Sequence, residues 1–446
     1  MHSIRLLNVA DGEVMPHRMA LVHGVATGCH RIQVRVRGEH VGDSKVVHDR
    51  FKTVFMLEDG ENAVDLVGQV IQENEDRSEV YDAAHLPFTV FHKPILGRRE
   101  VRLHYLMTTD SDGTFQAPPG EPNDQYTGMM RVRTMGLMIQ LATAEMLKAW
   151  FPEHPRTTFK ISDEVYETVL PLTNADAWGK DGHALWGLVN RNLSLHNPDV
   201  INLGVMSFSK WNGEKALAHT ALGGNCTALF GGASMFTWPT DVTEIEARFL
   251  DNRDIDRSIS FKDGPRNGRW GSASTTIGAC LHELGHCLNL PHPGGRLKNL
   301  GIMARGFDFL NRVFVLEENG RPLQLGEVEA YFDRGSACRL LYHPFLTQIE
   351  PRNSPKMYIE RGTEDIIVTA DDGIRQIAFF VNSENCGHKE FVLIDSPPKM
   401  VRLPNKNALR AEYDIKKTNH KMKISVVDSN GYFFGLFLKD IPLQSS

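Results

Sequence analysis

The chain has 446 residues, of which 41% are hydrophobic and 23% are charged, as in a globular protein with several domains. Its formal net charge of −6 argues against nucleic acid as a partner, because proteins that bind the phosphate backbone usually carry a basic surface. No apolar run reaches the roughly 18 residues of a membrane helix. The first residues show no positively charged region followed by an apolar one, as a signal peptide would have. We therefore expect a cytoplasmic protein with no membrane span.

The six cysteines are scattered and form no CxxC pair. In a large intracellular chain this pattern favours free thiols over three disulfides. The cysteines are Cys29, Cys226, Cys280, Cys287, Cys338 and Cys386.

Residues 1–95 are predicted to form an N-terminal β-sandwich of immunoglobulin type. The stretch HRIQVRVRG at 30–38 alternates apolar and polar residues, which is typical of a half-buried strand. Asp59-Gly60 is a turn signal between two further β-rich runs.

Residues 96–345 are predicted to form a domain with a mixed sheet and helices. Apolar residues recur at helical spacing over 128–151, for example at Met135, Met138 and Ile139, which predicts an amphipathic helix with a core-facing stripe. Strands are expected over 101–107, 158–171, 200–209 and 226–237.

The most informative stretch of this domain runs from His282 to His292 and reads HELGHCLNLPH. His282 and His286 are four residues apart, so on a helix they share one face and can bind one Zn²⁺. Glu283 follows the first histidine, the position from which a HExxH helix supplies a general base. His292 can join them only if the helix ends and the chain turns back.

The sequence also predicts that turn. Asn commonly ends a helix in the left-handed conformation, and Asn289 is followed by Pro291, which prevents the helix from resuming. The helix is expected to begin near one of three N-cap candidates, Ser272, Ser274 or Thr275. The alternative is a buried helix that carries His and Glu by chance.

The pattern resembles the metzincin class of zinc peptidases, with Asn289 where the longer motif has Gly. The resemblance implies three zinc ligands, a general base and a Met-turn beneath the metal. These are His282, His286 and His292 as ligands, Glu283 as the base, and Met303 in Gly301-Ile302-Met303 as the Met-turn.

A narrower resemblance covers more of the chain. The segments FKTVFMLEDGEN (51–62), LHYLMTTDSDGTFQAP (103–118) and CTALFGGASMFTWP (226–239), together with the HExxH helix, are similar to the Metallopep family of zinc metallopeptidases. This family is best represented in fungi, and the resemblance spans residues 1 to about 345. It supports the class of enzyme and says little about the substrate.

Residues 346–446 are predicted to form a C-terminal β-sandwich, again of immunoglobulin type. Strands are expected over 359–373, 374–383, 390–395, 420–431 and 432–441, with Asp-Gly and Asn-Gly turns. The expected fold class is therefore α+β, a metzincin-like zinc peptidase domain flanked by two all-β sandwiches.

The sequence predicts a zinc-dependent endopeptidase with one catalytic Zn²⁺, in which a metal-activated water attacks a peptide bond and Glu283 is the general base. A protein or peptide substrate is expected to pair with an edge strand near 227–236, although a buried strand fits the same residues. Two alternatives stay open. One is a scaffold or binding protein with a vestigial zinc site, and the other is a zinc hydrolase acting on a non-peptide amide or a glycopeptide.

Overall fold

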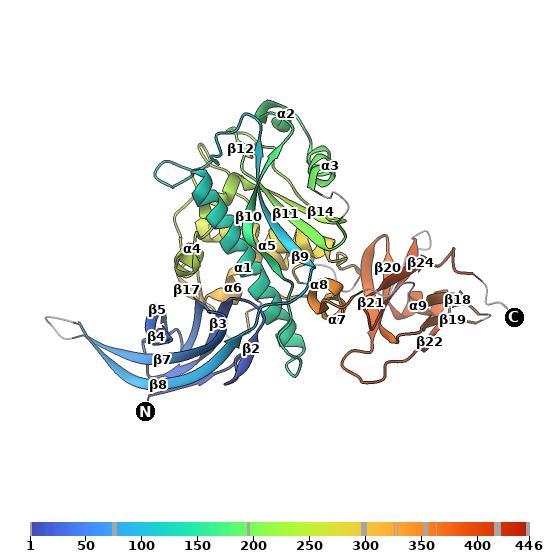
Figure 1. Ribbon diagram of the computed structural model, residues 1–446, viewed down its shortest axis with the longest axis horizontal. Helices are drawn as coiled ribbons and strands as arrows, with labels where there is room; N and C mark the ends of the chain where they lie inside the picture. Colours follow the sequence, from blue (N-terminus) through green and yellow to red (C-terminus); the bar gives the residue numbers. More distant parts are fainter. Residues whose placement is uncertain are drawn as a thin grey trace.

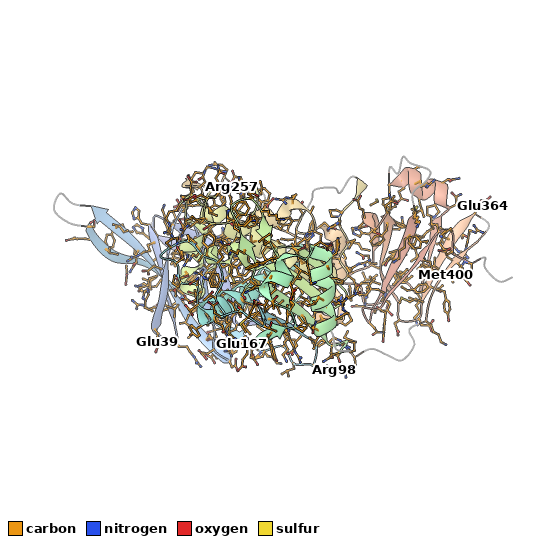
Figure 2. All side chains as sticks on the ribbon, turned by 90° about the horizontal axis from the view of Figure 1, so that it is seen from above. Glu39, Arg98, Glu167, Arg257, Glu364 and Met400 are labelled. Atoms are coloured by element: carbon orange, nitrogen blue, oxygen red, sulfur yellow. The ribbon has the colours of Figure 1, made fainter. Side chains whose placement is uncertain are left out.

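The computed structural model describes residues 2–73, 78–193, 197–295, 301–324, 326–327, 329–350, 356–362, 364–413 and 421–442. Within them the chain is a mixed α+β structure, mostly of sheets, in three groups. In Figure 1 the N-terminal sheets lie below the central group and the C-terminal sheets lie to its right. Figure 2 views the same groups from above, with Glu39 in the first, Arg257 over the second and Glu364 in the third. Among the described residues no helix is long and apolar enough to span a bilayer.

The N-terminal group is a β-sandwich whose two sheets share one core. The smaller sheet has the order β1-β3-β6 and the larger β2-β8-β7-β4-β5, with β2 and β8 parallel and the other pairs antiparallel. Because side chains alternate along a strand, Ile32 and Val34 of β4 point inward and meet Phe51 of β6. The immunoglobulin type stays a prediction. The strands are β1 (Ser3–Leu6), β2 (Glu13–Met15), β3 (Met19–Thr27), β4 (Arg31–Val36), β5 (Glu39–Lys45), β6 (Arg50–Met56), β7 (Gly60–Glu73) and β8 (Ser78–His92).

The central sheet has the order β10-β9-β11-β15-β14. Its first four strands are parallel, and β14 runs antiparallel to β15 at the outer edge. Every residue of β11 is buried, as expected of a parallel strand that is covered on both faces. The strands are β9 (Glu100–Thr108), β10 (Ile161–Leu170), β11 (Val200–Met206), β14 (Ala221–Gly224) and β15 (Thr227–Gly231).

Helices cover both faces of this sheet. Leu103 and Tyr105 of β9 point into the core that the sheet shares with two long helices, whereas Leu106 points to the opposite face and packs with two shorter ones. The long helices are α1 (Gln125–Trp150) and α5 (Gly268–Cys287), and the shorter ones are α2 (Asn174–Trp178) and α3 (Gly182–Leu193).

The helix predicted over residues 128–151 is confirmed as α1, although it begins earlier, at Gln125. Asp124 explains the start, because its carboxylate accepts a hydrogen bond from the Thr127 amide at 2.9 Å. The expected stripe faces the core, where Met135 and Met138 are fully buried.

The prediction that the HExxH helix begins near Ser272, Ser274 or Thr275 is wrong, because α5 starts at Gly268. The three hydroxyl side chains are buried within the helix and do not cap it. Thr275, for example, donates to the Asp308 carboxylate at 2.9 Å. Ser274 likewise donates to the Asp308 carbonyl at 2.9 Å. The partner segment is distant in the chain, so spacing along the sequence does not reveal these bonds.

The cysteines are free thiols, all six of them within the described residues. Burial raises the pKa of Cys287 to about 12 and raises that of Cys280 as well, so both stay protonated at neutral pH. On α5 they serve as small apolar residues of the core.

Shorter elements complete the central group. They are β12 (Lys210–Trp211), β13 (Ala216–Leu217), η1 (Gly232–Thr237), η2 (Val242–Glu244), α4 (Ile245–Phe249), η4 (Arg305–Phe309), α6 (Asn311–Phe314), β16 (Glu317–Glu318), β17 (Arg321–Pro322), α7 (Arg334–Leu341) and α8 (Pro344–Thr347).

The C-terminal group is a second β-sandwich, with sheets of order β18-β19-β22 and β21-β20-β23-β24 around a shared core. The strand predicted over 390–395 is wrong, because β21 ends at Glu390 and Leu393 adopts a turn conformation with φ of 54°. The division into domains at residues 95 and 345 stays a prediction. The elements are β18 (Met357–Arg361), β19 (Asp365–Ala370), β20 (Ile374–Val381), β21 (Glu384–Glu390), β22 (Met400–Pro404), α9 (Lys406–Glu412), β23 (Met422–Asp428) and β24 (Phe433–Phe437).

Arg156 joins the N-terminal sandwich to α1. Its side chain is 0% exposed, and its Nε donates to Glu13 at 2.9 Å. The same guanidinium pairs with Glu145 of α1 and with the backbone carbonyl of Asn8. Burial raises the pKa of Glu145, and the guanidinium opposes that shift. The buried guanidinium of Arg156 and the carboxylate of Glu145 therefore stabilise each other's charge.

Arg156→Met should lower the free energy of unfolding by about 3 kcal/mol, because Glu145 would be left buried without its cation. Calorimetric unfolding measures the loss. The double variant Arg156→Met/Glu145→Gln should regain part of the stability, since the orphaned charge is gone. A single variant as stable as the wild type would contradict this role.

Candidate metal centre

Helix α5 brings His282, Glu283 and His286 to the centre of the molecule. The helix packs against β14 and β15, and His282 and Glu283 are each only 8% exposed. The rings of His282 and His286 lie one turn apart, with centroids separated by 4.8 Å and planes nearly perpendicular. Two nitrogens on these rings can therefore reach one point beside the helix.

The chain reverses just after His286. Asn289 has φ of 59°, the left-handed conformation. The Leu290 amide donates to the Gly285 carbonyl at 2.9 Å, and the Asn289 amide donates to the His286 carbonyl at 3.1 Å. These two bonds form a Schellman motif, which ends the helix and satisfies its last carbonyls. The reversal carries His292 back towards the helix.

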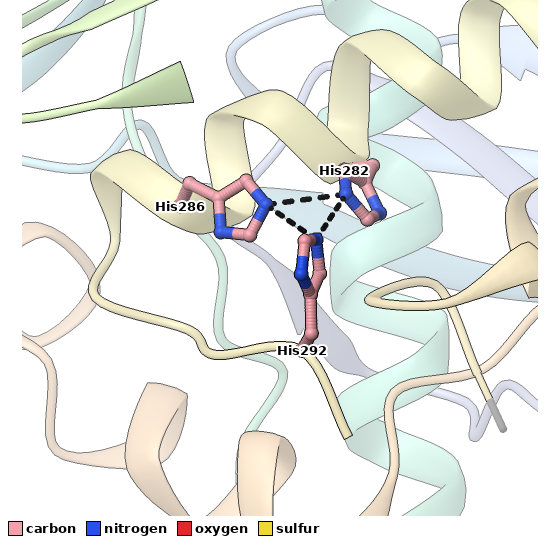
Figure 3. Close-up of side chains that lie close together, drawn as sticks. All are labelled: His282, His286 and His292. Atoms are coloured by element: carbon pink, nitrogen blue, oxygen red, sulfur yellow. Dashed lines mark hydrogen bonds between the residues drawn. The ribbon is translucent and has the colours of Figure 1, made fainter. Parts of the chain in front are cut away.

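The three histidines meet at their Nε2 atoms (Figure 3). The Nε2 atoms of His282 and His292 are 3.1 Å apart, and that of His286 lies 3.2 Å from the first and 3.0 Å from the second. His282 is buried, His286 is half-buried and His292 is exposed, so the cluster can be reached from solvent on the His292 side.

Backbone carbonyls fix the tautomers of two of these rings. Nδ1 of His282 lies 2.7 Å from the Ile302 carbonyl oxygen, and Nδ1 of His286 lies 3.0 Å from that of Leu290. A carbonyl only accepts, so each Nδ1 carries the proton and each Nε2 of a neutral ring carries a lone pair. Burial lowers the pKa of His282 to about 4 and lowers that of His286, so both rings are neutral at pH 7.

This donor set fits a zinc ion. Two lone pairs that face each other at 3.2 Å repel unless a cation lies between them. Tetrahedral Zn²⁺ at about 2.0–2.1 Å from each nitrogen would separate the nitrogens by about 3.3 Å, close to the spacing seen here. Zinc-binding histidines are usually oriented in this way, by a hydrogen bond from their other ring nitrogen to a backbone carbonyl or a carboxylate.

The predicted Met-turn forms a turn over residues 301–304. The Ile302 amide donates to the Tyr331 carbonyl at 2.7 Å, and the Ile302 carbonyl holds His282, as described above. Met303 is buried, and a Cβ at Gly285 would lie 2.5 Å from its Sδ atom. The turn thus packs against α5 between the two histidines. The role of the Ile302 carbonyl was not predicted, and only its place beside Met303 could have suggested it.

The carboxylate of Glu283 is held by the edge strand β14. Burial raises its pKa to about 7, and the Gly223 amide, which donates to the carboxylate, lowers it in part. The two backbones are very close, since a Cβ at Gly223 would lie 2.0 Å from the Glu283 carbonyl oxygen. Sequence reasoning missed Gly223, which lies outside the HExxH motif.

The expectation of an edge strand at 227–236 is wrong. β15 (Thr227–Gly231) is fully buried and is paired on both sides, with β11 and with β14, and residues 232–237 form the helix η1. The edge of the sheet is β14, whose exposed and half-buried residues ALGG gave no strand signal. Small residues and two glycines are poor strand formers, which explains the error.

One family model matches most of the chain. Residues 3–374 match the Metallopep family, described as "Putative peptidase family". The chain belongs to this family. The match extends beyond residue 345, where the resemblance predicted from the sequence ends.

Two fungal relatives are similar over most of the chain. "Putative zinc metalloproteinase YIL108W" of Saccharomyces cerevisiae is 25% identical over 400 residues, which cover 77% of this chain and 55% of the relative. "Putative zinc metalloproteinase C607.06c" of Schizosaccharomyces pombe is 24% identical over 443 residues, which cover 88% and 68%. This chain therefore spans about half of the first relative's length and about two thirds of the second's.

Among solved structures, OgpA from Akkermansia muciniphila aligns over 77% of this chain and 94% of its own, with 13% identity and a TM-score of 0.44. Its catalytically inactive form, in complex with an O-glycopeptide (glycodrosocin) substrate, aligns over 78% and 95% with 14% identity and the same TM-score of 0.44. A likeness at this level carries no inference about function.

Gly223→Ala should destabilise the protein by about 1–3 kcal/mol, because the new Cβ would overlap the Glu283 backbone. Gly224→Ala is the matched control on the same strand, since its Cβ would meet only Trp186 at 3.8 Å. We expect the control to be as stable as the wild type in thermal unfolding. Equal melting temperatures for the two variants would contradict the close contact between β14 and α5.

Proposed function

We propose that this protein is a zinc-dependent endopeptidase with a metzincin-like catalytic domain. The observation that carries the proposal is the convergence of three Nε2 atoms within 3.2 Å, two of them in tautomers that leave a lone pair free. A carboxylate follows the first of these histidines on the same helix. Membership of a peptidase family supports the same assignment.

A zinc ion held by His282, His286 and His292 supplies Lewis-acid chemistry, activating a water molecule and polarising a carbonyl group. Glu283 is then the general base. Its carboxylate takes a proton from the attacking water and delivers it to the leaving amine. The Gly223 amide and the burial of the side chain keep this carboxylate in one place. Met303 packs against α5 at Gly285, between the positions of the two helical histidines.

The outer edge of β14 suits an extended peptide. The Gly231 amide donates to the Thr220 carbonyl at 2.9 Å, so Thr220 faces β15. By the two-residue alternation of an antiparallel ladder, Ala221 and Gly223 then face outward. The Gly223 amide already donates to Glu283. The amide and carbonyl of Ala221 and the carbonyl of Gly223 can therefore form hydrogen bonds with a substrate strand.

Glu283→Gln should lower kcat by about a thousandfold while one zinc per chain remains, because the amide cannot accept the proton but does not disturb the ligands. His286→Ala should lose zinc as well as activity. Metal content by mass spectrometry and turnover of a broad peptide library measure both effects. One zinc per chain without cleavage in the wild type would overturn the endopeptidase and favour a scaffold or a hydrolase of non-peptide bonds.

The pH dependence follows from the state of Glu283. Only the ionised carboxylate acts as a base, so kcat/KM should be lost as the pH falls through the pKa of this group. Burial places that pKa at about 7, and a neighbouring dication favours the ionised form and lowers it. The acidic limb of a profile measured from pH 4 to 9 should therefore have its midpoint below pH 7. A midpoint above pH 8 would exclude Glu283 as the base.

A further inference from the structure

The loop that carries His292 is fastened to the C-terminal sandwich. The amide of Asn385 in β21 donates to the His292 carbonyl at 2.8 Å, and the Asn385 carbonyl accepts from the Gly294 amide at 2.7 Å. Pro293 and Asn385 thereby form an isolated parallel bridge. β21 is the outermost strand of its sheet, so these backbone groups of Asn385 face the loop and not a neighbouring strand.

The contact is close as well as hydrogen-bonded. A Cβ at Gly294 would lie 2.6 Å from the Cβ of Glu384 and 3.3 Å from the Sγ of Cys386. Only a residue without a side chain allows the loop to approach β21 to hydrogen-bond distance. The loop after the second histidine therefore acts as a short additional strand on the C-terminal sheet.

The other end of the loop is tied to the same sheet through Arg339 of α7. Its Nη1 donates to the carbonyl of Asn289, the residue at which the chain reverses, at 3.2 Å. The remaining nitrogens donate to Gln376 of β20 and Ser425 of β23, each at 3.3 Å. The guanidinium also lies over the ring of Phe433, 5.0 Å from its centroid. Both ends of the turn thus depend on the C-terminal sheet.

We propose that the C-terminal sandwich is part of the metal centre and that Asn385 is a positioning residue for His292, acting through its backbone. The proposal rests on the zinc site proposed above. His282 and His286 are fixed by their helix and by carbonyl partners of their Nδ1 atoms. His292 is the exposed member of the three, so the position of its ring depends on the path of its backbone. The clamp from β21 sets that path.

The test compares zinc binding by Asn385→Pro and Asn385→Ala in the full chain. Proline removes the amide hydrogen that reaches His292, and on an edge strand it costs no bond within the sheet. Alanine keeps the amide but loses the side chain. We expect the proline variant to raise the dissociation constant for Zn²⁺ about tenfold, the range for loss of a supporting bond around a metal. The alanine variant should bind zinc like the wild type.

Two further readouts separate positioning from general stability. The visible absorption of the Co²⁺-substituted protein should change in the proline variant only, because it reports the geometry of the ligands. The melting temperatures of the metal-free variants should not follow the order of their zinc affinities. A clamp with a merely structural role would lower these melting temperatures and leave the Co²⁺ spectrum unchanged.

Gly294→Ala disturbs the same contact with β21 from the side of the loop. It tests the positioning role if the proline variant does not fold. It too should weaken zinc binding about tenfold. Wild-type affinity and an unchanged Co²⁺ spectrum in both variants would overturn the positioning role and leave the proposed enzyme intact. A wild-type protein that binds no zinc would overturn the metal site itself, and the positioning role with it.

Discussion

The Nε2 atoms of three histidines meet at one point, and the centre of this molecule is arranged around that meeting. The lone pairs of His282 and His286 face each other there, which is unfavourable without a cation between them. The protein holds it by bonding the opposite side of two rings to carbonyls, those of Ile302 and Leu290. Each carbonyl belongs to a turn, and each turn is packed against α5. The geometry of the site is thus fixed by backbone more than by side chains.

Close backbone contacts make this possible. β14 approaches α5 at Gly223, the 301–304 turn approaches it at Gly285, and the loop after His292 approaches β21 at Gly294. At each position a Cβ would overlap the neighbouring segment. The glycines therefore determine how near the segments come, and the hydrogen bonds to Glu283, His282 and His292 follow from that spacing.

The sequence predicts the chemistry of this site better than its surroundings. The HExxH spacing and the helix-ending Asn289 concern neighbours along the chain, so local rules place them. The start of α5, the edge strand and the roles of Gly223, Ile302 and Asn385 depend on contacts between distant segments. Nothing in the residues ALGG marks a sheet edge, because their strand is defined by its pairing with β15. The two sandwiches and the long helix α1 were predictable because alternation and 3/4 spacing extend over many residues.

The clamp between β21 and the His292 loop has a consequence for how the protein is made. Asn385 follows His292 by about 90 residues, so during synthesis the loop emerges long before the strand that holds it. Domains fold largely in order as the chain leaves the ribosome. The central sheet and α5 can therefore form while the third histidine is still unsupported, and the clamp forms only after β21 has been made. The zinc site proposed above would therefore gain its full affinity for the metal only after the C-terminal sandwich has folded.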